Sequence, residues 1–128
     1  MELILVRHGL PVREERSDGS RADPPLSQEG RDQAERLALW FRSCPPDGIY
    51  SSPLRRAAQT AEAVALTLDL PVQVEPGVSE FDRDAESYIP MEELKRTDYA
   101  AWKQFVDGGY GDTVDFEVFR RGVVEALE

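Results

Sequence analysis

Short apolar runs alternate with amphipathic stretches along the first half of the chain, and this pattern predicts strands and helices in turn. Residues 3–6 are apolar and end at an Arg-His-Gly sequence. An apolar run this short, stopped by a turn signal, is typical of a strand buried on both faces of a parallel sheet. Residues 49–51 and 72–74 are predicted as two further short strands.

Two amphipathic helices are predicted between these strands. In residues 28–42 apolar side chains recur at helical spacing, with Ser27 as the cap and a double proline after them. The second helix is predicted to begin at Ser52 as the cap, with Pro53 in its first turn, and to run to residue 68. The order strand, helix, strand, helix, strand implies right-handed parallel crossovers and a layered α/β fold.

Two segments of the chain show neither a helical nor a strand period. Residues 11–25 are polar and rich in turn-forming side chains, and residues 75–87 are irregular and acidic. We expect both segments to be loops. Long loops beside the end of a buried strand are more often functional than idle, although disorder is an alternative.

The last third of the chain is predicted to be helical. Residues 91–106 have helical spacing, residues 107–111 form a glycine-rich break, and Asp112 or Thr113 caps a final helix that runs to the last residue. An aromatic stripe in this region belongs either to the core or to a lid over a substrate; it consists of Tyr99, Trp102 and Phe105.

Composition and charge restrict the class of protein. A chain of 128 residues with 41% hydrophobic side chains is expected to be one domain, residues 1–128. A net charge of −10 argues against nucleic acid or an anionic membrane as a partner. Cys44 is the only cysteine, so no internal disulfide is expected, and no stretch resembles a signal peptide or a membrane span. We therefore expect a cytoplasmic protein.

Side chains that suit phosphate chemistry follow two of the predicted strands. His8, the only histidine, lies between Arg7 and Gly9 at the carboxyl end of the first strand, where open α/β sheets place ligand crevices. Arg56 lies in the first turn of the second helix and can face the same crevice. Two arginines beside one imidazole would stabilise charge on the oxygens of a bound dianion.

Three sequence blocks, in order and at compatible spacing, carry a resemblance to a known family. They are LVRHG at 5–9, DPPLSQEGRDQA at 23–34 and SSPLRRAAQTAE at 51–62, and they are followed by Glu80. Over residues 3–80 the chain resembles the histidine phosphatase (phosphoglycerate mutase-like) superfamily. The resemblance implies a three-layer α/β/α sandwich with a mostly parallel sheet, and it requires no metal or organic cofactor.

The resemblance also implies a role for each candidate site residue. His8 would be the nucleophile that becomes phosphorylated, and Arg7, Gly9 and Arg56 would bind the phosphoryl group. Glu80 would protonate the leaving oxygen and later activate water. From the residues alone, the acid is one of Glu80, Asp82 and Asp84.

Two further expectations concern the surroundings of this site. A partly apolar setting from Val78 and Phe81 would keep Glu80 protonated near neutral pH. Arg13 and Arg21 are candidates for outer contacts to an anionic substrate. The acidic loop residues are not expected to bind a metal, because no histidine or cysteine accompanies them.

The sequence departs from the family pattern in two places. Residues 10–13 replace a polar run that commonly contains asparagine, and the second histidine that completes the family's phosphate pocket is absent. We therefore expect a domain that is truncated at its C-terminal end. Such a chain would be marginally stable, form a homo-oligomer, or be complemented by another C-terminal segment.

Two classes of function follow from these residues. The first is phosphoryl transfer from a small phosphorylated metabolite through a phosphohistidine, with hydrolysis of a phosphate monoester slightly favoured over mutase action. The alternative is a catalytically impaired module that binds phosphate or a protein partner, because its pocket lacks the second histidine.

Overall fold

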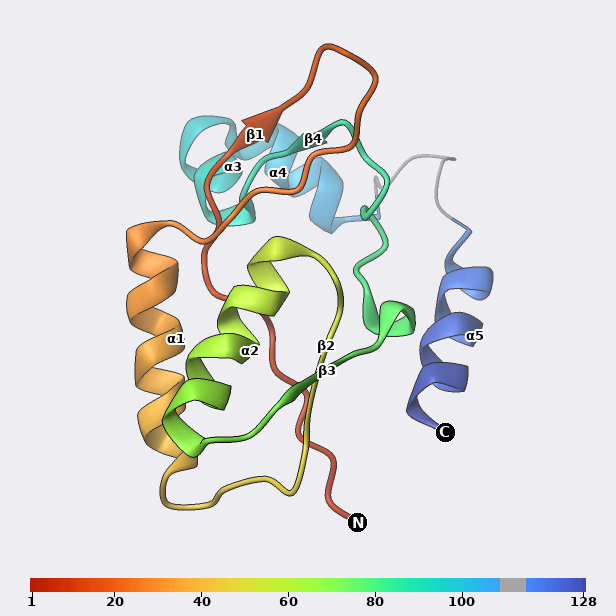
Figure 1. Cartoon of the computed structure of the whole chain (residues 1–128). Helices are drawn as coiled ribbons and strands as arrows, with labels where there is room; N and C mark the ends of the chain where they lie inside the picture. Colours follow the sequence, from red (N-terminus) through yellow and green to blue (C-terminus); the bar gives the residue numbers. More distant parts are fainter. Residues whose placement is uncertain (109–114) are drawn as a thin grey trace.

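The computed structural model describes residues 1–108 and 115–128 and contains two small sheets and five α-helices among them (Figure 1). The strands are β1 (Glu14–Glu15), β2 (Ile49–Ser51), β3 (Val72–Val74) and β4 (Ser87–Tyr88). The helices are α1 (Gln28–Phe41), α2 (Arg55–Leu68), α3 (Met91–Thr97), α4 (Tyr99–Val106) and α5 (Phe116–Leu127), with a 3₁₀ turn, η1, at Pro76–Val78.

The two short strands expected after the first helix and after the second are confirmed. β2 and β3 pair in parallel, with Ile49 opposite Val72 and Ser51 opposite Val74. The α2 helix connects them and packs against both. This β2–α2–β3 unit carries the layered α/β arrangement that the pattern predicts.

The prediction of a buried strand at residues 3–6 is wrong. These residues have no strand conformation, and their side chains are exposed, with 75% of Leu5 accessible. An inner strand needs hydrogen-bonded neighbours, whereas in the described part of the chain β2 pairs only with β3. The segment is apolar enough for a sheet, but in the described part of the chain it belongs to neither of the two sheets.

The α1 helix matches its predicted position closely. The Ser27 hydroxyl caps it by accepting a hydrogen bond from the Gly30 amide at 3.1 Å. The helix lies alongside α2 (Figure 1), and the core between them is formed by Ala38, Phe41 and Val64. Both helices therefore stand on the same side of the molecule and hold the loop that follows His8.

The α2 helix begins later than predicted, and Ser52 is not its cap. The helix starts at Arg55, whose amide donates instead to the Asp23 carboxylate at 2.8 Å. Ser52 lies too far upstream and is buried, so a side chain from a distant loop satisfies the first turn. Asp69, with φ of 54°, ends the helix in the left-handed region.

The segment 11–25, expected to be a loop, contains a short strand. β1 pairs with β4 in antiparallel fashion, with Glu14 opposite Tyr88. The Arg16 and Ala22 amides extend this contact by donating to the carbonyls of Glu86 and Ala85, each at 2.8 Å. A two-residue strand has no period to detect, so only the pairing reveals it.

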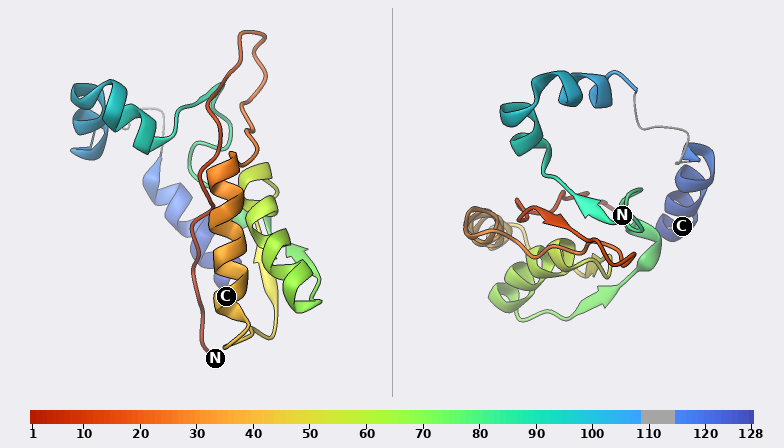
Figure 2. Two further views of the ribbon diagram at one scale, coloured as in Figure 1. Left: turned by 90° about the vertical axis from the view of Figure 1, so that its left-hand side faces the viewer. Right: turned by 90° about the horizontal axis from the view of Figure 1, so that it is seen from above.

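The predicted helix over 91–106 is divided at Asp98. The Asp98 backbone leaves the helical region (φ −148°, ψ 80°), and its carboxylate accepts from the Ala101 amide at 3.1 Å to cap α4. The predicted caps Asp112 and Thr113 lie outside the described residues, and Asp115 caps α5. The helices α3, α4 and α5 lie on the side of the molecule away from α2 (Figure 2).

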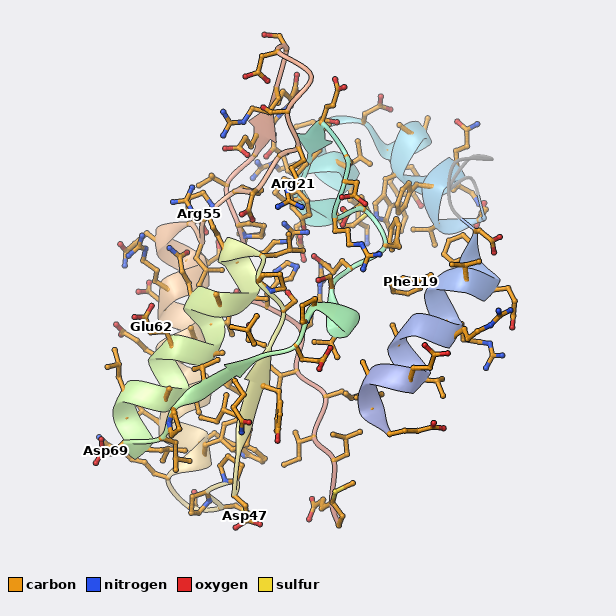
Figure 3. The ribbon with its side chains drawn as sticks, turned by 45° about the vertical axis from the view of Figure 1, so that its right-hand side comes forward. Arg21, Asp47, Arg55, Glu62, Asp69 and Phe119 are labelled. Carbon is orange, nitrogen blue, oxygen red and sulfur yellow. The ribbon has the colours of Figure 1, made fainter. Side chains whose placement is uncertain are left out.

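Aromatic packing joins the last helices to the acidic loop. The Phe81 ring contacts Phe105 from α4 and both Phe116 and Phe119 from α5, with ring centroids 6.0–6.4 Å apart. Figure 3 shows Phe119 extending from α5 toward the middle of the molecule. Phe81 therefore anchors the segment that carries Glu80.

Candidate functional site

The imidazole of His8 is buried, with 5% of its side chain exposed. Two hydrogen bonds hold the ring in place. Its Nδ1 lies 2.7 Å from the Gly9 carbonyl, and its Nε2 lies 3.0 Å from Oε1 of Glu80. A carbonyl oxygen can only accept, so Nδ1 carries a proton and donates it. Nε2 is therefore the nitrogen that faces Glu80.

Side chains from α1 and α2 fix the backbone that follows His8. The Gly9 amide donates to the Thr60 hydroxyl at 3.0 Å, and that hydroxyl donates to the Arg56 carbonyl at 2.7 Å. The Leu10 amide donates to Gln33 at 2.8 Å. These bonds set the Gly9 carbonyl that orients the imidazole.

Glycine is required where this loop crosses the start of α1. A Cβ on Gly9 would lie 2.5 Å from the Gly30 carbonyl oxygen, and a Cβ on Gly30 would lie 2.1 Å from the Leu10 carbonyl oxygen. Neither neighbour is a flexible side chain. The close approach of two backbones explains both glycines, in addition to their place in the sequence blocks.

Arg56 is a buried cation in the centre of the site, with 1% of its side chain exposed. Its Nε donates to Oε2 of Glu80 at 2.7 Å, and its Nη2 donates to Asp82 at 3.3 Å. The ring of Tyr88 covers the guanidinium at 4.3 Å. Among the described residues, Nη1 of Arg56 is the one buried side-chain nitrogen or oxygen atom without a partner.

Glu80 and Asp82 have opposite electrostatic settings. Burial raises the pKa of Glu80, but the hydrogen bond and charge of His8 and the charge of Arg56 outweigh it, so this pKa lies below its ordinary value. Burial and the charge of Glu80 raise the pKa of Asp82. The free protein therefore holds Glu80 as a carboxylate, and the expectation that apolar neighbours keep it protonated is wrong for this state.

The remaining candidates lie in different surroundings. Arg7 is 60% exposed and pairs with Glu92 on α3 at 3.3 Å, while Asp84 is exposed and lies 3.8 Å from Arg21. Arg13 contacts Glu15 and Glu93. The structure therefore brings His8, Glu80, Arg56 and Asp82 together, but not Asp84, Arg13 or Arg21.

Two cavities flank this cluster and share Arg7. The first has a volume of about 420 Å³ and is lined by His8, Gly9 and the start of α1 on one side and by α3 on the other. The second, of about 290 Å³, is lined by Glu80, Asp82, Tyr88 and aromatic residues of α4. Among residues 1–108 and 115–128, no group of three or more His, Cys, Asp or Glu side chains is arranged to hold a metal ion.

Sequence reasoning missed Tyr88 and Thr60 as site residues. Thr60 stands in the third sequence block, so its position there was an available signal. Tyr88 follows an acidic loop without any motif, and only the pairing of β4 with β1 brings its ring onto Arg56. Within residues 1–108 and 115–128, no helix is both long and apolar enough to cross a membrane.

Fold and site together define an α/β protein with a histidine, an arginine and a carboxylate at one buried centre, the class to which histidine-dependent phosphatases belong. Residues 3–128 match the histidine phosphatase superfamily (branch 1), and the chain belongs to this family. The expectation from the three sequence blocks is thereby confirmed.

Relatives within the family include a mutase and phosphatases. The chain is 30% identical over 115 residues to the probable phosphoglycerate mutase GpmB of Yersinia enterocolitica, covering 89% of this chain and 54% of that protein. It is 37% identical over 109 residues to phosphoserine phosphatase 1 of Hydrogenobacter thermophilus, covering 80% and 50%. The chain thus spans about half the length of these two curated relatives.

The solved structure of YhfR from Bacillus stearothermophilus has a similar fold. It superimposes with a TM-score of 0.65 at 24% sequence identity, covering 94% of this chain and 62% of that one. At this identity the likeness concerns the α/β fold only.

Proposed function

We propose that this protein hydrolyses a small phosphate monoester through a phosphohistidine formed on His8. One observation carries the proposal: Nε2 of His8 lies 3.0 Å from a carboxylate that is also bound to the buried Arg56. An imidazole, a carboxylate and a fixed cation lie together, and these are the groups that nucleophilic catalysis of phosphoryl transfer uses. The relatives named as phosphatases support the reaction type.

In the first step, the substrate phosphoryl group takes the place of Glu80 beside Arg56. With Nδ1 protonated, one proton lies between Nε2 and Oε1 of Glu80, and displacement of Glu80 leaves that proton on the carboxyl group. The approaching dianion favours this, because negative charge raises the proton affinity of a carboxylate. Nε2 then attacks phosphorus, the bond from phosphorus to the alcohol oxygen breaks, and Glu80 protonates that oxygen.

In the second step, water attacks the phosphohistidine. The phosphorus–nitrogen bond breaks, its electron pair returns to Nε2, and the Glu80 carboxylate accepts a proton from the water. Arg56 and Arg7 hold the equatorial oxygens in both steps, and the Arg56 Nη1 atom gains the oxygen partner that it lacks in the free protein. Arg7 must leave Glu92 to take part.

We also propose the finer features that accompany this activity. The protein would be a three-layer α/β/α sandwich with a mostly parallel sheet, of which β2 and β3 form one parallel pair. Its substrate would be a small cytoplasmic metabolite. A net charge of −10 supports the absence of nucleic acid and anionic membranes among its partners.

The second candidate is a phosphate-binding or protein-interaction module with little catalytic activity. The observation that favours it is the contact in the free protein: Glu80 pairs with both His8 and Arg56. A phosphate ion could then displace Glu80 without any bond being cleaved.

Hydrolysis of 4-nitrophenyl phosphate by the 128-residue chain, measured from pH 5 to 8 beside His8→Ala, separates the two candidates. The enzyme proposal expects turnover that is lost in the variant, and alkaline quenching should trap a phosphorylated chain only when His8 is present. Phosphate binding without turnover in either protein would establish the binding module instead. Turnover that survives in His8→Ala would refute a phosphohistidine on this residue.

Glu80→Gln tests the acid role with two substrates. If Glu80 protonates the leaving oxygen, the variant should lose far more activity with an alkyl phosphate than with 4-nitrophenyl phosphate, whose leaving group needs no proton. An equal loss with both substrates would assign Glu80 a positioning role only.

A further inference from the structure

We propose that the second cavity receives the leaving group of the substrate and selects phosphate monoesters of aromatic or apolar alcohols. The inference rests on the proposed function, because it takes Glu80 as the group that protonates the leaving oxygen. It assigns a substrate class to a surface next to the phosphate site.

The position of Glu80 decides on which side the leaving group lies. His8 lines the first cavity, whereas Glu80 lines the second. In phosphoryl transfer the attacking and leaving atoms lie roughly in line on opposite sides of phosphorus. A phosphoryl group attacked by Nε2 therefore directs its alcohol oxygen away from His8. Since that oxygen must reach Glu80, the organic group enters the second cavity.

The walls of the two cavities differ in chemistry. Apart from Arg7, Glu80 and Asp82, the second cavity is walled by apolar and aromatic side chains, among them Phe81, Tyr88, Ile89, Met91, Trp102 and Phe105. The first cavity carries charged and amide groups, which are Arg7, Glu29, Gln33, Glu92, Glu93 and Arg96. A sugar or a carboxylated alcohol in the second cavity would lose its water and meet few polar partners beyond Arg7, Glu80 and Asp82. An aromatic ring would gain contacts there.

The aromatic wall is supported from behind. Trp102 packs against Tyr99 with ring centroids 5.3 Å apart, and the Lys95 ammonium lies 4.6 Å from the Trp102 ring centre. Phe81 is held by the cluster that includes Phe119. A volume of about 290 Å³ lies just below the roughly 300–1,000 Å³ found for ligand pockets, which suits one ring on a short linker. Of the two expectations for the aromatic stripe, the wall over the substrate is therefore favoured for Trp102 and Phe105.

Two non-hydrolysable phosphonates of equal charge test the inference without any need for turnover. Calorimetry should give 2-phenylethylphosphonate an affinity about tenfold or more above that of ethylphosphonate, a preference typical of apolar pockets. Trp102→Ala should remove most of this preference, and Trp102→Phe should keep it. Trp40→Ala is the matched control: this tryptophan lies on α1, is 57% exposed and lines neither cavity.

The outcomes distinguish this inference from the proposed function. Equal affinity of the two phosphonates for the wild-type chain, or no binding of either, overturns the leaving-group pocket. A loss of preference in Trp40→Ala equal to that in Trp102→Ala also contradicts it. Selective binding together with no phosphate release would overturn the enzymatic proposal and leave the pocket in place. His8-dependent release of phosphate with no preference for the aromatic ester would overturn the pocket alone.

Discussion

At the scale of single residues, the contact between His8 and Glu80 connects the resting protein with its chemistry. The Gly9 carbonyl fixes the proton on Nδ1, so the proton between Nε2 and Glu80 is the one that the first step must move. A lowered pKa of Glu80 in the free protein does not oppose the acid role that we propose for it, since a bound phosphate dianion would change that setting. In the proposed mechanism, the Glu80 carboxylate occupies the phosphate position until a substrate replaces it.

The pH dependence of stability reports the Glu80 interaction. Its folded-state pKa lies below the ordinary value of 4.5, so the stabilisation is present above pH 4.5 and is lost as the pH falls through the folded-state pKa. The difference in free energy of unfolding between wild type and Glu80→Gln should therefore shrink as the pH falls below 4.5. Urea unfolding from pH 3 to 7 measures it. A difference that grows in acid would contradict the assigned ion pair with His8 and Arg56.

Tyr88 is expected to act as a positioning residue through Arg56. Its ring lies 4.3 Å from the guanidinium, and desolvation together with the charge of Glu80 raises the pKa of its hydroxyl to about 12, so the group stays neutral. A desolvated cation–π contact is worth about 2 kcal/mol. Tyr88→Leu should thus lower kcat/KM about tenfold or more, mainly through KM, while Tyr88→Phe should stay near wild type.

Steady-state kinetics with an alkyl phosphate provide the check on Tyr88. If Tyr88→Phe lowers kcat/KM as much as Tyr88→Leu does, the hydroxyl rather than the ring face supports Arg56. A Leu variant with unchanged KM would mean that Arg56 needs no support from the ring.

At the scale of elements, α1 and α2 act as a scaffold for the loop after His8. The start of α1 lies against the Leu10 backbone through Ser27 and Gly30, and α2 supplies Thr60. The sequence predicted both helices, because apolar spacing within each segment, and for α1 the Ser27 cap, favours helix formation. It did not predict that Asp23 caps α2, since that contact joins residues 32 positions apart.

The close approach at Gly30 gives a stability prediction. Gly30→Ala places a Cβ 2.1 Å from the Leu10 carbonyl oxygen, and overpacking of this kind costs about 1–3 kcal/mol. Gly122→Ala in α5 is the matched control, because a Cβ there meets nothing within 4 Å. That variant should gain about 0.5–1 kcal/mol from higher helix propensity. Urea denaturation of both variants makes the comparison, and equal stabilities would show that the loop adjusts freely.

At the scale of the whole molecule, a run of exposed apolar side chains near the N-terminus is left uncovered. Leu3, Ile4, Leu5 and Val6 follow one another, with exposed fractions of 41–75%. A contiguous apolar stretch of this kind favours association, which the net charge of −10 opposes. The balance between apolar association and charge repulsion should depend on salt concentration, because ions screen the repulsion between negatively charged chains.

We expect reversible self-association of the chain that grows with ionic strength. Leu5→Asp should weaken this association. The control Leu66→Asp changes a leucine of α2 that is 78% exposed but lies outside residues 3–6, and it should have a smaller effect. Sedimentation velocity over a range of protein and salt concentrations measures the change. A monodisperse monomer under all conditions would contradict the expectation.

The sequence by itself determined the features that depend on near neighbours along the chain. The approximate positions of α1, β2, α2 and β3 follow from apolar spacing and turn residues, although the start of α2 does not, and the three blocks place His8 and Arg56 in their family context. These are local choices, in which each residue competes mainly with alternatives a few positions away.

Only the tertiary structure decided what depends on distant partners. His8 and Glu80 are 72 positions apart, and Glu80 rather than Asp82 or Asp84 contacts the imidazole because η1 and the Phe81 cluster set the course of that loop. The β1–β4 pair that brings Tyr88 to Arg56 has no local signal. Residues 3–6 have the composition of a strand but pair with no strand in the described part of the chain, and backbone hydrogen bonding in a sheet belongs to pairs of segments.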